Sequence, residues 1–129
     1  MASSLPLIVL LLCCVGLAHS YLRVSNLRAQ NLRLNKYSKP DGYVKVYYGS
    51  IFMGQTSFVR GNRDPSWPQS FNYYSAKLGG RLTVKVYDKN AVFDDYLGGC
   101  TTVISKRGIY SGWCNLSTGG TLYLTYSFI

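Results

Sequence analysis

The segment "RLTVKVYD", residues 81 to 88, alternates apolar and polar side chains with the two-residue period of a β-strand. Its apolar face consists of Leu82, Val84 and Val86. The same alternation recurs in "YVKVYYG" (43–49) and in "TLYLTYSF" (121–128). After residue 20, no apolar pattern of helical period extends over eleven residues. We therefore expect an all-β domain in which one face of each main strand is buried.

Shorter segments complete the strand pattern. They are "YLRVSNL" (21–27), "GQTSFV" (54–59), "SFNYY" (70–74) and "CTTVIS" (100–105). Strands that recur about every ten to fifteen residues, with glycine, proline and asparagine between them, predict an antiparallel β-sandwich. Three longer loops, 30–42, 60–68 and 88–99, follow alternate strands. Because alternate loops of a sandwich gather at one end, we expect these three to share a rim.

The first twenty residues have the pattern of a secretory signal peptide. Residues 5–17 are almost continuously apolar, but they are fewer than the roughly 20 residues that a membrane-spanning helix needs. "AHS" (18–20) places small residues where a signal peptidase would cut after Ser20. We therefore expect residues 1–20 to be removed and residues 21–129 to form one secreted domain. A signal anchor is the alternative interpretation.

The composition argues against most kinds of active site. The chain has fourteen Lys and Arg but only five acidic residues, all of them aspartate, and its formal net charge is +9. Its one histidine, His19, lies in the predicted signal peptide. Without histidine, the mature domain lacks the commonest general base and the commonest zinc ligand, so we expect it not to be an enzyme. Aspartate oxygens instead suit a hard cation such as calcium.

Several motifs occur in the order found in C2 domains, which are calcium-dependent phospholipid-binding modules. They are "NLRAQNLRLN" (26–35), "SKPDGYVKVYYG" (38–49), "NRDPSWPQSF" (62–71), "LTVKVYDKN" (82–90) and "DDYLGG" (94–99). Within that family the chain resembles most the C-terminal C2 domain of perforin, with "LGGC", "WCNL" and "GTLYLTY" in common. The resemblance implies an eight-stranded antiparallel sandwich of the second, permuted topology, in which residues 121–128 replace the usual first strand.

The resemblance implies that the first and third loops hold calcium. The main ligands would be Asp41, Asp88 and Asp95, and the auxiliary ligands would be Asp94, Asn35 and Asn90. The register of the two adjacent aspartates stays open, because the third loop is one residue shorter than in perforin. Both asparagines stand where the family usually has aspartate, so fewer charges attract the ion and binding should be weak. A solvated acidic turn without metal is the alternative.

The resemblance also implies that the loop tips contact lipid. The candidates for insertion are Tyr37, Val92 and Phe93. Phe93 could instead fold back onto the sandwich. Basic residues on the loops and on outward strand faces would attract an anionic membrane surface; they are Lys36, Lys39, Lys45, Arg81, Lys85 and Lys89.

Two covalent features are expected. The cysteines that match Cys100 and Cys114 are bonded in perforin-like sequences, so the resemblance implies a disulfide here. "NLS" (115–117) is the sequon of the chain and makes Asn115 a candidate for N-glycosylation. Its position beside a cysteine at a strand end leaves its accessibility open.

The sequence therefore predicts a secreted, non-enzymatic and monomeric C2 module that binds phospholipid membranes peripherally through calcium, with no nucleic-acid partner. The chief alternative is a cationic extracellular protein that binds an anionic glycan or a protein partner without calcium. A third class is a defence protein that damages membranes directly.

Overall fold

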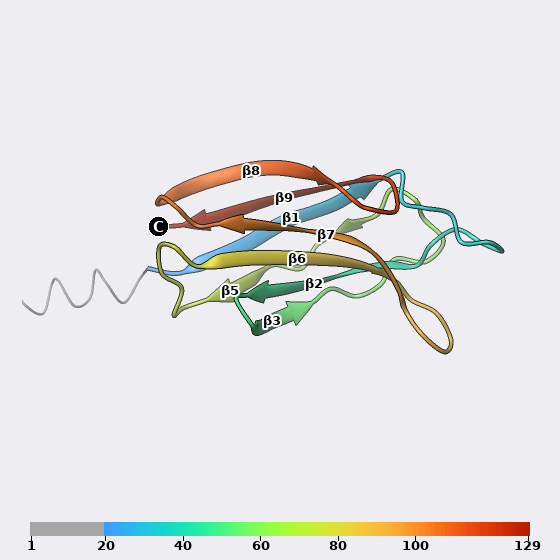
Figure 1. Ribbon diagram of the computed structural model, residues 1–129, viewed down its shortest axis with the longest axis horizontal. Coiled ribbons are helices and arrows are strands. Elements are labelled where there is room, and N and C mark those ends of the chain that lie inside the picture. Colours follow the sequence, from blue (N-terminus) through green and yellow to red (C-terminus); the bar gives the residue numbers. More distant parts are fainter. Residues whose placement is uncertain (1–19) are drawn as a thin grey trace, which may run out of the picture.

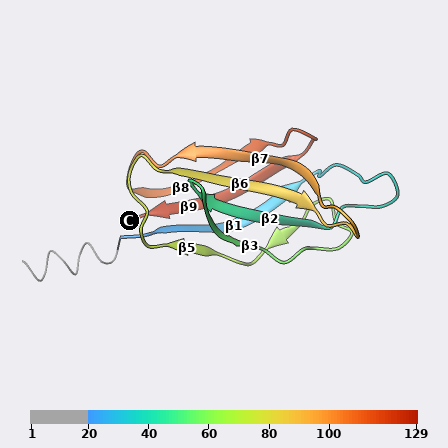
Figure 2. The same cartoon turned by 60° about the horizontal axis from the view of Figure 1, so that its bottom comes forward.

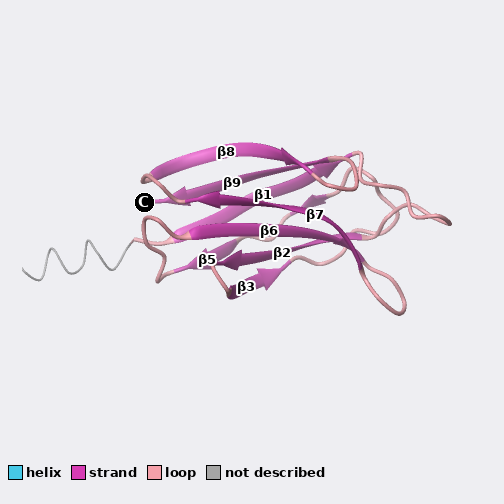
Figure 3. Cartoon of the chain, in the orientation of Figure 1, coloured by secondary structure: helices cyan, strands magenta, loops and turns pink. Residues whose placement is uncertain are grey.

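The computed structural model describes residues 20–129, and they form two antiparallel sheets packed face to face (Figure 1). The predicted signal segment, residues 1–20, lies outside the described residues except for Ser20. The strands are β1 (Leu22–Gln30), β2 (Gly42–Tyr48), β3 (Ile51–Gln55), β4 (Ser66–Trp67), β5 (Phe71–Tyr73), β6 (Arg81–Asp88), β7 (Asp95–Val103), β8 (Gly108–Asn115) and β9 (Thr121–Phe128). Loops alone join them (Figure 3).

Sheet A has the strand order β4-β1-β9-β8, and sheet B has the order β3-β2-β6-β7. The short strands β4 and β5 both pair with β1, β4 at Leu27 and β5 at Leu22, so they share one edge position. Each sheet therefore has four strand positions, and the predicted eight-stranded sandwich is confirmed. The C-terminal strand β9 lies between β1 and β8, as the permuted topology requires.

The core follows the alternation read from the sequence. Leu82, Val84 and Val86 of β6 are buried and face the apolar side chains of sheet A. Trp67 is also buried, and its indole N–H donates to the carbonyl of Gly42 at 3.0 Å. Among the described residues there is no helix long and apolar enough to cross a membrane.

One outward position departs from the alternation. The alternation in "YVKVYYG" places Tyr43 on the face opposite Val44 and Val46, which is the outer face of sheet B, yet Tyr43 is only 5% exposed. Its ring stacks on that of Tyr87, with centroids 5.5 Å apart, and its hydroxyl donates to Asp94 from the third loop. Neighbouring side chains cover Tyr43, although it lies outside the core between the sheets.

The three predicted loops do share one end of the sandwich, far from the C-terminus (Figures 1 and 2). Backbone hydrogen bonds join them where they leave the sheets. Lys89 N–H donates to the carbonyl of Asp41 at 2.9 Å, and Asn62 N–H donates to the carbonyl of Pro40 at 3.0 Å. The first loop is thereby tied to both of the others.

The predicted disulfide between Cys100 and Cys114 is present. It joins β7 to β8, which are the edge strands of the two sheets. The bridge therefore holds the sandwich closed along one side.

We expect the double variant Cys100→Ala/Cys114→Ala to lose about 3 kcal/mol of unfolding free energy, because a bridge across about 15 residues restricts the unfolded chain. Urea denaturation of the variant and of the oxidised wild type measures the difference. Reduced wild type is the matched control and should resemble the variant. Equal stability of the oxidised protein and the variant would contradict the prediction.

Candidate functional site

Asp88 lies at the end of the sandwich that carries the three long loops, and its side chain is buried, with the residue only 3% exposed. It is the last residue of β6, and its Oδ1 accepts the backbone N–H of Asp41 at 2.9 Å. Burial raises the pKa of the Asp88 carboxyl, and the carboxylates of Asp41 and Asp95 raise it further. Hydrogen bonds from Asp41 N–H and from the Asn35 side chain oppose this shift only in part.

Two hydrogen-bonded links surround Asp88. Asp41 Oδ1 accepts the N–H of Gly61 at 2.7 Å, which connects the first loop to the second. Asn90 donates from its side-chain amide to Asp95 Oδ2 at 2.8 Å and accepts from the amide of Asn35 at 3.4 Å. Five of the six predicted ligands thus form one polar network: Asn35, Asp41, Asp88, Asn90 and Asp95.

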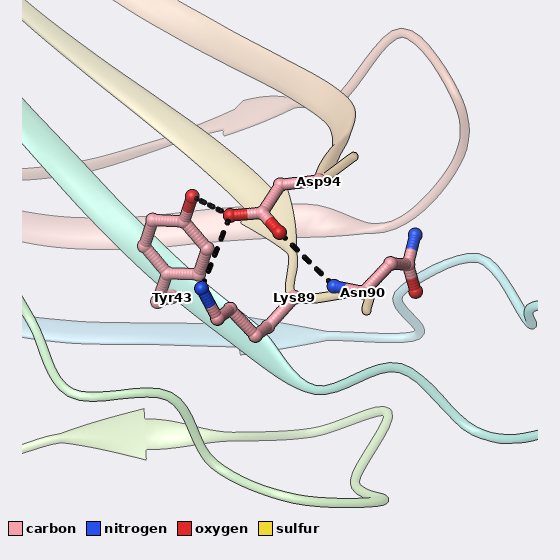
Figure 4. A network of polar contacts seen from close by, with 4 residues as sticks. All are labelled: Tyr43, Lys89, Asn90 and Asp94. Carbon is pink, nitrogen blue, oxygen red and sulfur yellow. Dashed lines mark hydrogen bonds and ion pairs between the residues drawn. The ribbon is translucent and has the colours of Figure 1, made fainter. Parts of the chain in front are cut away.

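Asp94 touches this network only through the backbone N–H of Asn90, and its other contacts lie elsewhere. Its Oδ2 accepts from the hydroxyl of Tyr43 at 2.5 Å and lies 3.9 Å from the ammonium of Lys89, and its Oδ1 accepts the N–H of Asn90 at 3.0 Å. The side chain of Asn90 points away from Asp94 (Figure 4). Hydrogen bonds from Tyr43 and Asn90 lower the pKa of the Asp94 carboxyl. Asp94 therefore anchors the third loop to the outer face of sheet B.

The donor chemistry of the network fits calcium. It offers the carboxylates of Asp41, Asp88 and Asp95 and two amide oxygens, all hard oxygen donors of the kind that calcium takes. In residues 20–129, however, no three His, Cys, Asp or Glu side chains gather closely enough to hold a metal by themselves. For the site to hold calcium, the amide oxygens of Asn35 and Asn90 would have to face the ion beside the carboxylates.

The predicted tips are exposed. Tyr37 is 86% exposed, and Val92 and Phe93 are each 81% exposed. The alternative in which Phe93 folds back onto the sandwich is therefore wrong. Three apolar side chains from the first and third loops stand free in water beside the acidic network.

The predicted basic residues fall into separate groups. Lys36 and Lys39 lie on the first loop, and the ammonium of Lys36 lies 5.4 Å from the ring centre of Tyr37. Lys89 begins the third loop and pairs with Asp94. Arg81 starts β6, at the end of that strand opposite Asp88, so it lies away from the loops.

Lys45 and Lys85 lie on the outer face of sheet B among aromatic rings. The Lys45 ammonium is 4.7 Å from the ring centre of Tyr87, and that of Lys85 is 5.1 Å from the ring centre of Tyr47. Sequence reasoning had missed the tyrosines of this face as functional residues. The signal was available, because "YVKVYY" and "KVYD" place Tyr at alternate positions beside each lysine.

A family model described as C2 domain matches residues 20–116. The chain is 34% identical over 106 residues to Perforin-1 of Mus musculus and 32% identical over 105 residues to Perforin-1 of Rattus norvegicus. These matches cover 81% and 80% of the chain. The chain spans 19% of the length of each of these two curated relatives.

Solved structures show the same architecture. A structure described as "Structure of a C2 domain" superposes with a TM-score of 0.82 at 38% identity, covering 84% of this chain and 97% of that one. "Extended-Synaptotagmin 2, C2A- and C2B-domains, calcium bound" has a TM-score of 0.74 at 23% identity, covering 84% of this chain and 45% of that one. The second likeness bears on the fold alone.

We expect Asp88→Asn to be more stable than the wild type in the presence of chelator. The variant removes a buried charge, while its amide oxygen can still accept the N–H of Asp41. The folded pKa of Asp88 is raised, so the wild type gains stability as the pH falls through that pKa. The difference in thermal midpoint should therefore be largest at neutral pH and should shrink in acid. A variant less stable than the wild type at neutral pH would contradict this.

Proposed function

Because the chain belongs to the C2 domain family, we propose that it is a secreted, non-enzymatic module that binds phospholipid membranes peripherally and through calcium. The observation that carries this proposal is that the first and third loops hold the neighbouring carboxylates of Asp41, Asp88 and Asp95 and also carry three exposed apolar side chains at their tips. An acidic site alone would repel an anionic membrane. If calcium neutralises the carboxylates, the exposed side chains of Phe93 and Val92 on the same loop can enter the membrane.

The metal-free site is electrostatically unfavourable. Asp88 is buried, and Asp41 and Asp95 add like charges that raise its pKa. Calcium would relieve this repulsion, held by the three carboxylates with the amide oxygens of Asn35 and Asn90. When bound, the ion supplies positive charge at the rim that can also attract lipid phosphate. The module would therefore approach a membrane with this end.

The exposed tips supply the apolar part of the interaction. Tyr37 comes from the first loop, and Val92 and Phe93 come from the third. If the Phe93 ring were fully buried in the bilayer interface, its transfer from water would contribute about 1.5 to 3 kcal/mol to binding. Insertion from two loops would also fix the orientation of the sandwich on the surface.

Basic side chains would strengthen docking on an anionic surface. Lys36 and Lys39 lie beside the tip of the first loop, and each basic group close to an anionic leaflet contributes about 1 kcal/mol. Lys45 and Lys85 belong to the outer face of sheet B, so they contribute if the sandwich tilts toward that side. Arg81 is too far along β6 to reach a membrane docked at the loops.

The asparagines bear on where the module would work. Asn35 and Asn90 replace two charged ligands of the family pattern by neutral ones, which weakens attraction for the ion. Extracellular calcium modules work at dissociation constants of about 10⁻⁴ to 10⁻³ M. We infer that the protein works as a monomer outside the cell, where such an affinity suffices, and without a nucleic-acid partner.

A second candidate function rests on the outer face of sheet B. There Lys45 and Lys85 lie over tyrosine rings, and this arrangement does not depend on calcium. Sulfated glycans would bind such a basic face, and an acidic protein partner would also suit it. Retention on immobilised heparin in the presence of chelator would favour this candidate. Dye leakage from liposomes would instead indicate direct membrane damage.

We expect Phe93→Ala and Asp88→Asn to fail differently in vesicle cosedimentation. Phe93→Ala keeps every proposed ligand, so a calorimetric titration should still detect calcium, while affinity for anionic vesicles falls about ten- to a hundredfold. Asp88→Asn removes a charge from the centre of the proposed site, so it should lose both calcium binding and vesicle binding. The matched control is Leu78→Ala, which removes an exposed apolar side chain just before Arg81, at the end of β6 opposite Asp88, and should bind as the wild type does.

We expect the double variant Asn35→Asp/Asn90→Asp to need less calcium for vesicle binding than the wild type, because two added charges attract the ion more strongly. Cosedimentation across calcium concentrations, with anionic and with neutral vesicles, measures the shift. Equal vesicle binding with calcium and with chelator would leave the basic surface as the sole cause and would overturn the calcium mechanism.

A further inference from the structure

The outer face of sheet A carries an exposed tryptophan that the calcium loops do not use. Trp113 lies on the edge strand β8 and is 65% exposed. Side chains alternate along a strand, so Trp113 and Asn115 face outward together, while Cys114 between them faces inward to its disulfide. The indole ring thus stands on the same face as the candidate glycosylation site.

The surroundings of Trp113 suit an amphipathic ring. Its cross-strand neighbour is Tyr123, and the guanidinium of Arg28 lies 3.9 Å from the centre of the Tyr123 ring. Ser111 and Thr125 line a shallow pocket of about 320 Å³ beside these residues. An exposed indole face next to hydroxyl and guanidinium groups can take the apolar face of a sugar ring and bond its hydroxyls.

The sequon lies within reach of Trp113. Asn115 is exposed at the end of β8, where it pairs with Thr121 before the turn to β9. Leu116 is buried, and Ser117, which completes the sequon, is exposed. Two residues along a strand span about 7 Å, which the first sugars of a glycan on Asn115 can cover to reach Trp113.

We propose that Asn115 carries an N-linked glycan whose first N-acetylglucosamine rings pack on Trp113. The glycan covers the exposed indole, and Arg28 and Thr125 supply polar partners at the rim of the pocket. The chain's own glycan is favoured over a free ligand because its anchor stands on the same strand face as the indole. The proposal rests on the secretion included in the proposed function, but not on calcium or lipid binding.

Modification is tested by secretion from a eukaryotic host, with residues 21–129 placed behind a heterologous secretion signal. All the strands of the sandwich, from Leu22 of β1 to Phe128 of β9, lie within these residues. We expect an intact mass that includes a glycan, and removal of that mass by an N-glycosidase. Ser117→Ala is the matched control, because it destroys the sequon and keeps both Asn115 and Trp113. A secreted wild-type protein with unmodified Asn115 would overturn the proposal.

Packing is tested by quenching tryptophan fluorescence with acrylamide. The chain has two tryptophans, and Trp67 is buried at 2% exposed, so the quenching reports on Trp113. We expect the quenching constant of the glycosylated protein to be less than half that of the enzymatically deglycosylated protein. Ser117→Ala should match the deglycosylated sample, which excludes an effect of the aspartate that deglycosylation creates. Equal quenching with and without the glycan would overturn the packing.

The same samples separate this proposal from the proposed function. Vesicle binding in calcium, measured on the glycosylated protein, tests docking and leaves the mass and quenching results unchanged. A glycosylated protein with a shielded Trp113 that fails to bind vesicles would overturn the proposed function and support the glycan. A protein that binds vesicles in calcium but carries no glycan on Asn115 would support the proposed function and overturn the glycan proposal.

Discussion

Asp88 ends a strand that runs through the middle of sheet B, and its carboxylate is buried there instead of standing in the loop that follows. Because a buried charge needs partners, the backbone of Asp41 turns its N–H toward Asp88 and the first loop is drawn to the third. Asp41 in turn accepts from Gly61 and fixes the second loop. The rim of the sandwich is thus organised around one buried acceptor oxygen at the end of β6.

The same burial leaves the acidic network with electrostatic repulsion that its hydrogen bonds do not fully offset. Hydrogen bonds from Asp41 and Asn35 offset the cost of the Asp88 charge only in part, and its raised pKa reflects the remainder. The two asparagines reduce the repulsion among the acids, since Asn90 donates its amide to Asp95. They therefore stabilise the metal-free state and at the same time weaken the expected attraction for calcium.

The two outer faces of the sandwich differ in chemistry. Sheet B presents lysines over tyrosine rings and holds Asp94 through Tyr43, so the third loop leaves the sheet on that side. Sheet A presents Trp113 two residues before the sequon at the end of β8, and β8 ends near the same end of the molecule as the three long loops (Figure 1). A glycan on sheet A would leave the basic face of sheet B as the side that approaches an anionic surface.

Alternation in "RLTVKVYD" and the similar segments predicted β1, β2, β6 and β9, their inward side chains and the fold class, because the two-residue period is a property of the local backbone. It did not predict β8, and it placed a strand at 54–59 where the structure has β3 at Ile51–Gln55. The order of the motifs also placed Asp41, Asp88 and Asp95 at one rim. Only the tertiary structure decided that Asp94 bonds the Tyr43 hydroxyl while Asp95 bonds the Asn90 side chain, and that Tyr43 is covered. Tyr43 and Asp94 lie 51 residues apart, and their contact arises only once β2 pairs with β6 and β6 with β7. The pattern of a strand fixes which face a side chain takes, but what covers that face depends on partners distant in sequence.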